Sequence, residues 1–324
     1  MKSISVVIPN YNGRELLERN LPFVYLALST SGVTDYEIII PDDVSTDTSI
    51  EFLQTQYPQI LVIPHLVNSG FGGNSNSGIF ASSKELVLLL NTDVELTDGY
   101  FIPLMQYFDN PDTFGVMSRI IGLNSDEVQD GAKYPDYTFG HIGATLNYRS
   151  KTQSTLYTLF LSGANALFDR KKLLELGGFD ELYNPYYAED VDLSLRAWKI
   201  GYKCYYDDTA VCRHPVSATI KREKPRKVKI ITKRNKMYIH YIHLEMLERV
   251  VFLLVMSLKT MLRALMFHSV YVLAYFAFIK TISQCNKSRK RIQELQQIHQ
   301  STMTLKDIRT LIQQSIKKSP ITKF

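Results

Sequence analysis

Two acidic corners of the chain carry residue types that could do chemistry. The first, Asn91 to Asp93, directly follows a strand-like apolar run, and the second, Glu189-Asp190, opens an amphipathic stretch. A carboxylate that follows a buried strand lies at the edge where open α/β sheets bind ligands, and a carboxylate that starts a helix can face the same crevice. One could hold a metal ion that neutralises a diphosphate, while the other deprotonates an incoming hydroxyl group. These corners could therefore transfer a group from a nucleotide diphosphate.

The elements that must position these corners follow from the alternation of apolar runs and polar turns. Repeated strand-then-helix order predicts a parallel sheet with right-handed crossovers, so that the polar turns at the strand ends line one crevice. Pro22 should bend or interrupt the first helix. The predicted strands are residues 5–8, 36–40, 60–63 and 86–90, and the predicted helices begin after residue 13 and span 48–57.

The segment from Asn68 to Asn76 is rich in glycine and asparagine. It follows the third predicted strand and does not complete G-x-G-x-x-G, so it matches the dinucleotide-binding fingerprint only weakly. We expect a flexible turn that enters a helix near residues 79–83. Its glycines either serve the turn alone or let the backbone approach a ligand closely.

Composition places the chain among globular proteins. It has 324 residues, of which 45% are hydrophobic and 21% charged, and its formal net charge is +5. Its three cysteines show neither paired nor metal-site spacing, and the apolar run at the amino terminus is too short for a signal peptide. We therefore expect one α/β domain with an appendage, and a catalytic part in the cytoplasm.

A strongly basic run from Lys221 to Lys236 contains Glu223 as its only acidic residue. Such a run is usually a solvated or flexible connector, but beside an apolar segment it could also contact anionic lipid. It lacks the interleaved aromatic residues of a surface that stacks nucleic-acid bases, so we expect no nucleic-acid partner.

Apolar residues after position 244 recur at helical spacing, and the apolar stretch 264–279 is shorter than the roughly 20 residues of a bilayer span. We expect attachment in the membrane plane; a helical hairpin packed on the catalytic domain or on another subunit is the alternative. A chain cut after Lys236 should then keep its nucleotide-sugar site. The expected divisions are a catalytic domain at 1–220, a basic connector at 221–243, membrane-associated helices at 244–285, and a polar helical or disordered tail at 286–324.

Seven short motifs occur in one order, and through them the chain resembles glycosyltransferase family 2. The resemblance is to the nucleotide-sugar-dependent transferases of the GT-A fold, and more narrowly to the bacterial rhamnosyl- and galactofuranosyl-transferase-like branch. Each motif alone is weak, but their ordered coincidence over residues 3 to 217 is specific. The motifs are residues 6–13, 41–47, 68–76, 91–93, 162–164, 177–181 and 189–192.

The resemblance implies a nucleotide-binding side of the crevice. An aspartate can accept a hydrogen bond from the ring N–H of uracil or thymine, and a tyrosine can stack on the ring. Asp93 should bind Mn²⁺ or Mg²⁺ together with the phosphates, and His214 lies where some relatives place a further ligand. Asn91 replaces the first aspartate of a full Asp-X-Asp. The residues expected to bind the nucleotide sugar are Pro9, Tyr11, Asp42, Asn68, Gly72, Asn91, Thr92 and Asp93.

The resemblance also implies an acceptor side, where Asp190 is the expected catalytic base. Gly163, Glu189 and Asp192 are the expected acceptor contacts. Three acidic residues at the start of a helix can instead simply interact well with the helix dipole, which is the alternative interpretation of Glu189, Asp190 and Asp192.

Together these features predict an inverting hexosyl- or deoxyhexosyltransferase with a mixed α/β GT-A domain and a helical C-terminal extension. It should use a UDP- or dTDP-type donor, a divalent cation and a glycan or lipid-linked acceptor, in cell-surface polysaccharide synthesis at the inner face of the cell membrane. Its C-terminal helices could also form a homo-oligomer. The alternatives are a nucleotidyltransferase on a related sheet and a non-catalytic, membrane-anchored glycan-binding scaffold.

Overall fold

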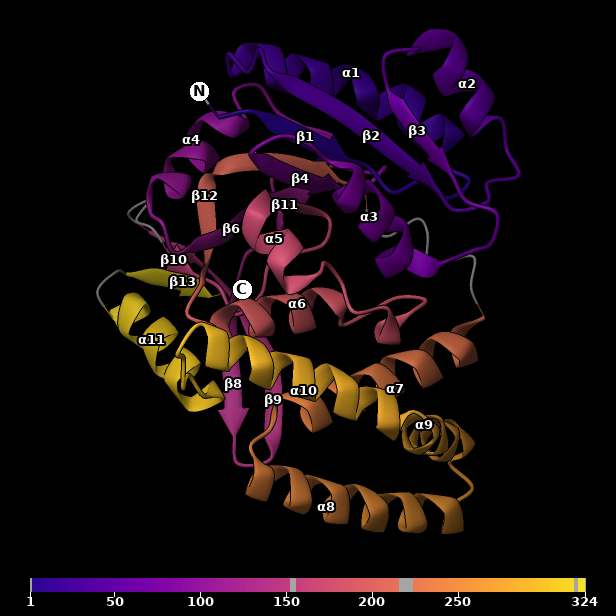
Figure 1. Ribbon diagram of the computed structural model, residues 1–324, viewed down its shortest axis with the longest axis vertical. Helices are drawn as coiled ribbons and strands as arrows, with labels where there is room; N and C mark the ends of the chain where they lie inside the picture. Colours follow the sequence, from indigo (N-terminus) through magenta and orange to yellow (C-terminus); the bar gives the residue numbers. More distant parts are fainter. Residues whose placement is uncertain (1, 152–155, 216–223, 318–319, 324) are drawn as a thin grey trace.

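The computed structural model describes residues 2–151, 156–215, 224–317 and 320–323. A mixed sheet forms the upper half of the molecule in Figure 1, and helices cover both of its faces. Its strands follow the order β10-β12-β6-β11-β4-β1-β2-β3, with β5 beside β12 and β7 beside β6. The strands are β1 (Ile4–Val7), β2 (Tyr36–Asp42), β3 (Leu61–Pro64), β4 (Leu86–Leu90), β5 (Glu95–Leu96), β6 (Thr113–Gly122), β7 (Val128–Asp130), β10 (Leu156–Tyr157), β11 (Asn165–Asp169) and β12 (Lys203–His214).

The parallel half of this sheet confirms the predicted α/β class. β4, β1, β2 and β3 run parallel, so their carboxyl ends and the turns that follow meet at one edge. β11 then runs antiparallel to β4, which brings the start of β11 to the same edge. The helices of this half are α1 (Arg14–Thr30), α2 (Ser49–Gln56), α3 (Gly70–Ala81), α4 (Phe101–Met105), α5 (Arg170–Leu176) and α6 (Glu189–Lys199).

Pro22 does not interrupt the first helix, so that part of the prediction is wrong. α1 continues through it to Thr30, with Pro22 on the exposed side. The opposite side buries Leu17, Leu21 and Val24 against the sheet. Each large apolar side chain buried in this way contributes about 1.5–3 kcal/mol to the stability of the fold. The three side chains together offset the roughly 3 kcal/mol that proline costs inside a helix.

The glycine-rich segment is also not the flexible turn that its composition predicted. α3 begins at Gly70, so most of this segment is helical. A Cβ atom at Gly78 would lie 2.4 Å from Val7 Cγ1, so only glycine lets α3 pack this closely on β1. Inside the helix, Asn74 Nδ2 donates to the carbonyl oxygen of Asn10 at 3.1 Å. Tertiary packing therefore overrides the low helix propensity of the segment.

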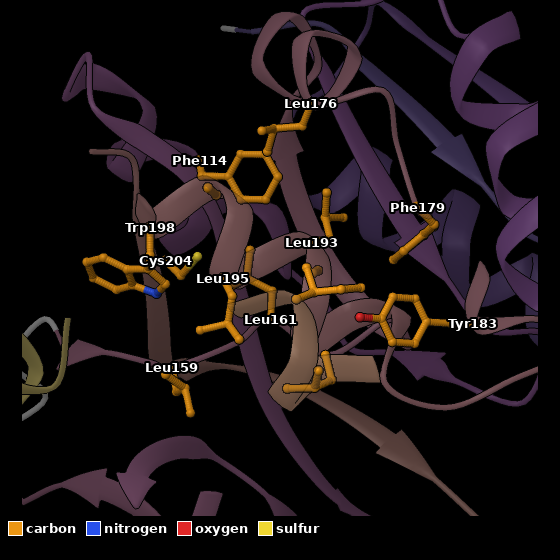
Figure 2. Packing of buried hydrophobic residues seen from close by; sticks show 14 of the residues in the cluster. Phe114, Leu159, Leu161, Leu176, Phe179, Tyr183, Leu193, Leu195, Trp198 and Cys204 are labelled. Atoms are coloured by element: carbon orange, nitrogen blue, oxygen red, sulfur yellow. The ribbon is translucent and has the colours of Figure 1, made fainter. Parts of the chain in front are cut away.

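The main hydrophobic core lies between the sheet and α6. Figure 2 shows side chains from α6, among them Leu193 and Trp198, close to Phe114 of β6 and to Leu161. Tyr183, from the one-turn 3₁₀ helix Glu181–Tyr183, closes this core. The helix that carries the second acidic corner is thus fixed along its buried side.

The C-terminal helices belong to the same core. Tyr238, Ile242 and Leu244 are at most 1% exposed, and Lys199 Nζ donates to the carbonyl oxygen of His243 at 2.9 Å. Residues 225–243 therefore form a packed helix rather than a flexible connector; residues 221–223 of the basic run lie outside the described residues. These helices are α7 (Pro225–His243), α8 (Met246–Leu265), α9 (Ser269–Lys280), α10 (Ile282–Ile298) and α11 (Leu305–Lys317).

The polar C-terminal segment is ordered over most of its length. α10 buries Cys285 and Ile292, and α11 buries Ile308 and Ile312, because their few apolar residues recur at helical spacing. Next to α11 lies a small second sheet (Figure 1). Its strands are β8 (Ala132–Thr138), β9 (His141–Ser150) and β13 (Ile321–Lys323).

α8 lies at the outer edge of the molecule, where it contacts α9 and α7 (Figure 1). Its outward side is apolar and exposed, and Glu248, Phe252 and Thr260 occupy the inward side. Among the described residues, no helix combines the length and the apolar character that a bilayer crossing requires.

A chain cut after Lys236 should not fold to the native state, contrary to the expectation from sequence. The cut removes Tyr238, Ile242 and Leu244 from the core. Several such side chains at about 1.5–3 kcal/mol each match the whole stability of a typical domain, about 5–15 kcal/mol. Thermal unfolding should lose its cooperative transition, whereas a chain cut after Lys317, which keeps every helix, should retain one. Equal melting temperatures for the first cut and the full chain would show that α7 is dispensable.

Candidate active site

The turn after β1 and the turn after β2 are bonded into one unit through Asp42. Asn10 Nδ2 and Ser45 Oγ both donate to Asp42 Oδ2 at 2.7 Å, and the Ser45 backbone N–H donates to Oδ1 at 2.9 Å. Asp42 is 1% exposed. Its carboxylate therefore shapes the turn, and its predicted contact with a nucleoside base stays a prediction. Tyr11 is 53% exposed beside this turn, with its ring open to a ligand, and Pro9 precedes it.

Asp43, which sequence analysis did not single out, organises the start of α3. Its carboxylate accepts the backbone N–H groups of Ser69 at 2.7 Å and Gly70 at 3.1 Å. Asn68 is exposed at this corner, whereas Gly72 is buried, where a Cβ atom would lie 3.1 Å from Asn184 Oδ1. Close helix packing explains Gly72 without a ligand, and its contact with a nucleotide sugar stays a prediction.

Val44 adopts a left-handed backbone conformation next to the Asp42 turn. Its φ angle is +63°, and its side chain is 37% exposed. A β-branched residue rarely adopts this conformation, and such strain costs about 1–3 kcal/mol. The bonded turn around Asp42 holds it in place, and strain of this kind is concentrated at ligand-binding sites.

Asp93 and His214 meet because β5 pairs with the end of β12. The antiparallel register places Glu95 opposite Arg213, so the next residue of β12, His214, comes beside the corner that follows β4. His214 Nε2 lies 3.3 Å from Asp93 Oδ2, and both side chains are largely buried. Thr92 forms the same corner, and its carbonyl oxygen accepts a hydrogen bond from Asn20 Nδ2 at 2.7 Å.

This pair suits a divalent cation. A carboxylate oxygen and a neutral imidazole nitrogen that converge on one point are an ordinary partial ligand set for Mn²⁺, and the carboxylate alone suits Mg²⁺. No group of three or more His, Cys, Asp or Glu side chains gathers as a metal site anywhere in the described part of the chain. Two protein ligands leave the remaining positions for diphosphate oxygens and water.

A short series of contacts connects the two acidic corners. The backbone N–H of Asn91 donates to the carbonyl oxygen of Ala164 at 3.0 Å, so the metal corner lies beside the turn before β11. In that turn, a Cβ atom at Gly163 would lie 3.9 Å from Asp190 Cβ. The structure thus brings Gly163 and Asp190 together, and their roles toward an acceptor stay predictions.

The buried Glu189 and the half-buried Asp190 form an acidic pair. Burial, and then the charge of Asp190, raises the pKa of Glu189 to about 8, and Glu189 Oε2 has no hydrogen-bond partner. Burial also raises the pKa of Asp190, but backbone N–H groups of Val191 and Gly163 oppose that shift by donating to its carboxylate. Hydrogen bonds to the ionised form favour it, so Asp190 is the member of the pair that ionises first.

Asp192 does not contact an acceptor, so that assignment is wrong. It is 0% exposed, with Oδ2 held by Arg196 Nε at 2.7 Å. Oδ1 lies 2.8 Å from His243 Nε2 and also accepts the hydroxyl group of Tyr183 at 3.2 Å. Burial lowers the pKa of His243, so this imidazole acts as a neutral donor. Asp192 therefore fixes the helix that carries Asp190.

Asn235 of α7 supports the turn that leads into the acidic pair. Its Nδ2 lies 2.6 Å, 3.0 Å and 2.8 Å from the carbonyl oxygens of Tyr183, Tyr186 and Tyr187. Tyr187 and Ala188 both have positive φ angles, +77° and +74°. Two consecutive strained residues need such an anchor. Sequence analysis missed Asn235, and only its position in an amphipathic part of the basic run could have drawn attention to it.

Comparison with known proteins gives the family. The model of "Glycosyl transferase family 2" matches residues 5–177, more than half of the chain, which therefore belongs to this family. The N-acetylglucosaminyl-diphospho-decaprenol L-rhamnosyltransferase of Mycobacterium tuberculosis is 25% identical over 236 residues, covering 65% of this chain and 75% of that protein. The GalNAc(5)-diNAcBac-PP-undecaprenol beta-1,3-glucosyltransferase of Campylobacter jejuni is 31% identical over 110 residues, 33% of this chain and 34% of that protein. Matches to relatives from Nostoc and Bacillus spizizenii span 36% and 14% of their lengths.

Solved structures confirm the GT-A fold. GalNAc-T7 with UDP, GalNAc and Mn²⁺ has a TM-score of 0.66 at 14% identity, over 98% of this chain and 58% of that chain. A mannosyltransferase from Pyrobaculum calidifontis with GDP-Man and Mn²⁺ has a TM-score of 0.52 at 15% identity, over 97% of this chain and 79% of that chain. The chain is thus a family 2 glycosyltransferase with a GT-A domain and a helical C-terminal region.

Asn235→Ala should lower turnover more than it weakens donor binding. It leaves one buried and two partly buried carbonyl groups without their donor, at a cost of about 1–3 kcal/mol, and frees the turn before Asp190. We expect kcat to fall at least tenfold with KM for the donor changed less than threefold, measured below the variant's melting temperature. Lys229→Ala, on the exposed side of the same helix, is the control. An unchanged kcat in a destabilised variant would restrict Asn235 to folding.

Proposed function

We propose that this chain is an inverting, metal-dependent glycosyltransferase that moves a hexosyl or deoxyhexosyl group from a UDP- or dTDP-type donor to a hydroxyl group of a glycan or lipid-linked acceptor. The observation that carries the proposal is the path from the Asp93–His214 pair through Asn91 and Gly163 to Asp190. This path supports a common site for the cation and the base.

On the donor side, Asp93 and His214 would hold the cation, and Asn91 and Thr92 form the wall beside the diphosphate. When bound, a divalent cation offsets the negative charge that accumulates on the departing nucleoside diphosphate. Tyr11 stacks on the base, supported by its 53% exposure next to the rigid Asp42 turn.

On the acceptor side, Asp190 takes the proton of the acceptor hydroxyl group. The oxygen forms a bond to the anomeric carbon as the bond from that carbon to the diphosphate oxygen breaks, and the nucleoside diphosphate leaves with the electron pair. Attack opposite to the leaving group inverts the anomeric configuration. A single ionised carboxylate beside a protonated Glu189 suits this step, because a general base must be unprotonated at the working pH.

The relatives support the acceptor class. The Campylobacter and Mycobacterium enzymes are named for acceptors carried on undecaprenol and decaprenol diphosphates, and their names describe glucosyl and rhamnosyl transfer. We propose an acceptor of this kind in the synthesis of a cell-surface polysaccharide. Two solved neighbours contain Mn²⁺, which supports Mn²⁺ as the cation, with Mg²⁺ as the alternative.

We also propose peripheral attachment at the inner face of the cell membrane. Exposed apolar residues of α8 recur at helical spacing, and the neighbouring α7 is rich in lysine and arginine. Apolar burial and attraction to anionic lipid together give firm attachment where either alone is weak. Oligomerisation through the same surface is the alternative.

Asp190→Asn should lower turnover by roughly two to four orders of magnitude while donor binding persists, because that is the usual contribution of a general base. Glu189→Gln is the matched control. The pKa of Glu189 is about 8, so it is protonated at pH 7, and glutamine resembles the neutral acid. Donor hydrolysis and calorimetric binding of UDP measure the two effects. Near-normal turnover in a folded Asp190→Asn variant would contradict the assignment of Asp190 as the base.

Asp93→Ala should weaken nucleotide-diphosphate binding mainly when Mn²⁺ is present, because the cation and the phosphates bind as one unit. His214→Ala should show a milder form of the same defect. Calorimetric titration of each variant with UDP, once with Mn²⁺ and once with EDTA, measures the loss of affinity in both conditions. An equal loss with and without the cation would point to misfolding or to a direct contact with the nucleotide.

A further inference from the structure

A cavity of about 370 Å³ lies between α7, α8, α9 and the tip of the β8–β9 hairpin. It shares no lining residue with the crevice of the candidate active site. Its walls are mainly apolar and include Met237, Phe252, Val255 and Met256. A volume of this size falls in the range of small-ligand sites.

Three lysines also line the cavity, Lys233 and Lys236 from α7 and Lys259 from α8, and no aspartate or glutamate does. Within the described residues, none of the three forms an ion pair with a carboxylate, although Lys233 lies 5.7 Å from the ring centre of Tyr271. Three unneutralised ammonium groups beside an apolar cavity select a ligand that has both an anionic group and a hydrocarbon part.

Two histidines, His141 and His240, line the wall, and His240 adds no charge. Burial lowers the pKa of His240 to about 4, so its ring is neutral at physiological pH. Its Nδ1 lies 2.6 Å from the carbonyl oxygen of Lys236, and the Ile142 backbone N–H donates to its Nε2 at 3.1 Å. Both ring nitrogens of His240 are therefore used within the protein, which leaves the three lysines and His141 to bind an anion.

The outer surface next to the cavity is an apolar stripe along α8, at the edge of the molecule in Figure 1. Its members repeat at intervals of three and four residues, so they share one side of the helix. Lys259 and Arg263 are exposed beside the stripe and add positive charge. The exposed members are Leu247, Val250, Leu254, Leu258, Met261 and Leu265.

We propose that the cavity binds one anionic phospholipid of the membrane on which α8 lies, with an acyl chain between Phe252 and Met256 and the phosphate among Lys233, Lys236 and Lys259. The proposal rests on the proposed membrane attachment and deepens it. The stripe would enter the apolar layer of the leaflet, which sets the mouth of the cavity at the level of the head groups. Charge complementarity identifies the lipid as anionic.

The test is a calorimetric titration of the full chain with dihexanoylphosphatidylglycerol below its micelle concentration. Dihexanoylphosphatidylcholine, which has the chains without net charge, and glycerol 1-phosphate, which has the anion without chains, are the comparison probes. We expect the anionic lipid to bind at one site at least tenfold more tightly than either. Equal affinity for the uncharged lipid or for glycerol phosphate would overturn the proposal.

Variants locate the site. Lys236→Gln and Lys259→Gln should each weaken binding of the anionic lipid about fivefold, which corresponds to about 1 kcal/mol per cation near an anionic head group. Lys229→Gln, one helical turn from Lys233 but not part of the cavity wall, is the matched control and should have a smaller effect. Equal losses in all three would show a diffuse charge effect and contradict a defined site.

Val255→Trp separates the cavity from the stripe. Val255 lines the cavity and is 41% exposed, so the indole should fill the space for the chain without making the stripe less apolar. Vesicle binding should persist while titration with the short lipid fails. If the variant instead abolishes a concentration-dependent dimer seen by sedimentation, the surface binds a second copy and the proposal is wrong. Donor hydrolysis in lipid-free buffer should stay unchanged in every variant, which separates failure here from failure of the proposed transferase.

Discussion

The rest of the structure depends on the buried carboxylate of Asp192. Burial alone would raise its pKa, but Arg196 and the hydrogen bond from His243 outweigh that effect and bring the pKa to about 2. The same Arg196 donates to the carbonyl oxygens of Leu176 and Gly178 at 2.8 Å. An unpaired buried charge costs several kcal/mol, so these segments must assemble together. The cluster thereby joins α6, the turn after α5 and the end of α7.

This constraint makes the C-terminal helices part of the catalytic unit. α7 supplies His243 beneath the catalytic helix and Asn235 beneath the strained turn before Glu189. The opposite side of α7 lines the lysine-rimmed cavity next to α8. α7 thus contacts both the residues that support the proposed base, Asp190, and the proposed lipid site. A membrane-facing surface and a sugar-transfer site on one rigid element suit an enzyme whose acceptor is attached to lipid.

Much of the fold could be predicted from local pattern. Buried strands such as Leu86–Leu90 are short apolar runs with turn residues behind them. The family resemblance implied that Asp93 and His214 lie together, and the structure places the two side chains in contact. The errors have a common cause in tertiary packing. α3 is helical because its glycines permit close contact with β1. This contact is tertiary, so the helix propensities of the residues do not predict it. Asp192 looked available for an acceptor because its partner His243 lies 51 positions away in the sequence.

The central claim is that Asp190 acts as a single base, opposite to the leaving diphosphate. Proton NMR of donor hydrolysis tests it most directly, because water can replace the acceptor and the anomer released first can be observed before mutarotation. With Mn²⁺ and a nucleotide sugar that the enzyme turns over, the first sugar released should have the anomeric configuration opposite to that of the donor. Initial release of the retained anomer would contradict the role of Asp190 and the mechanism built on it.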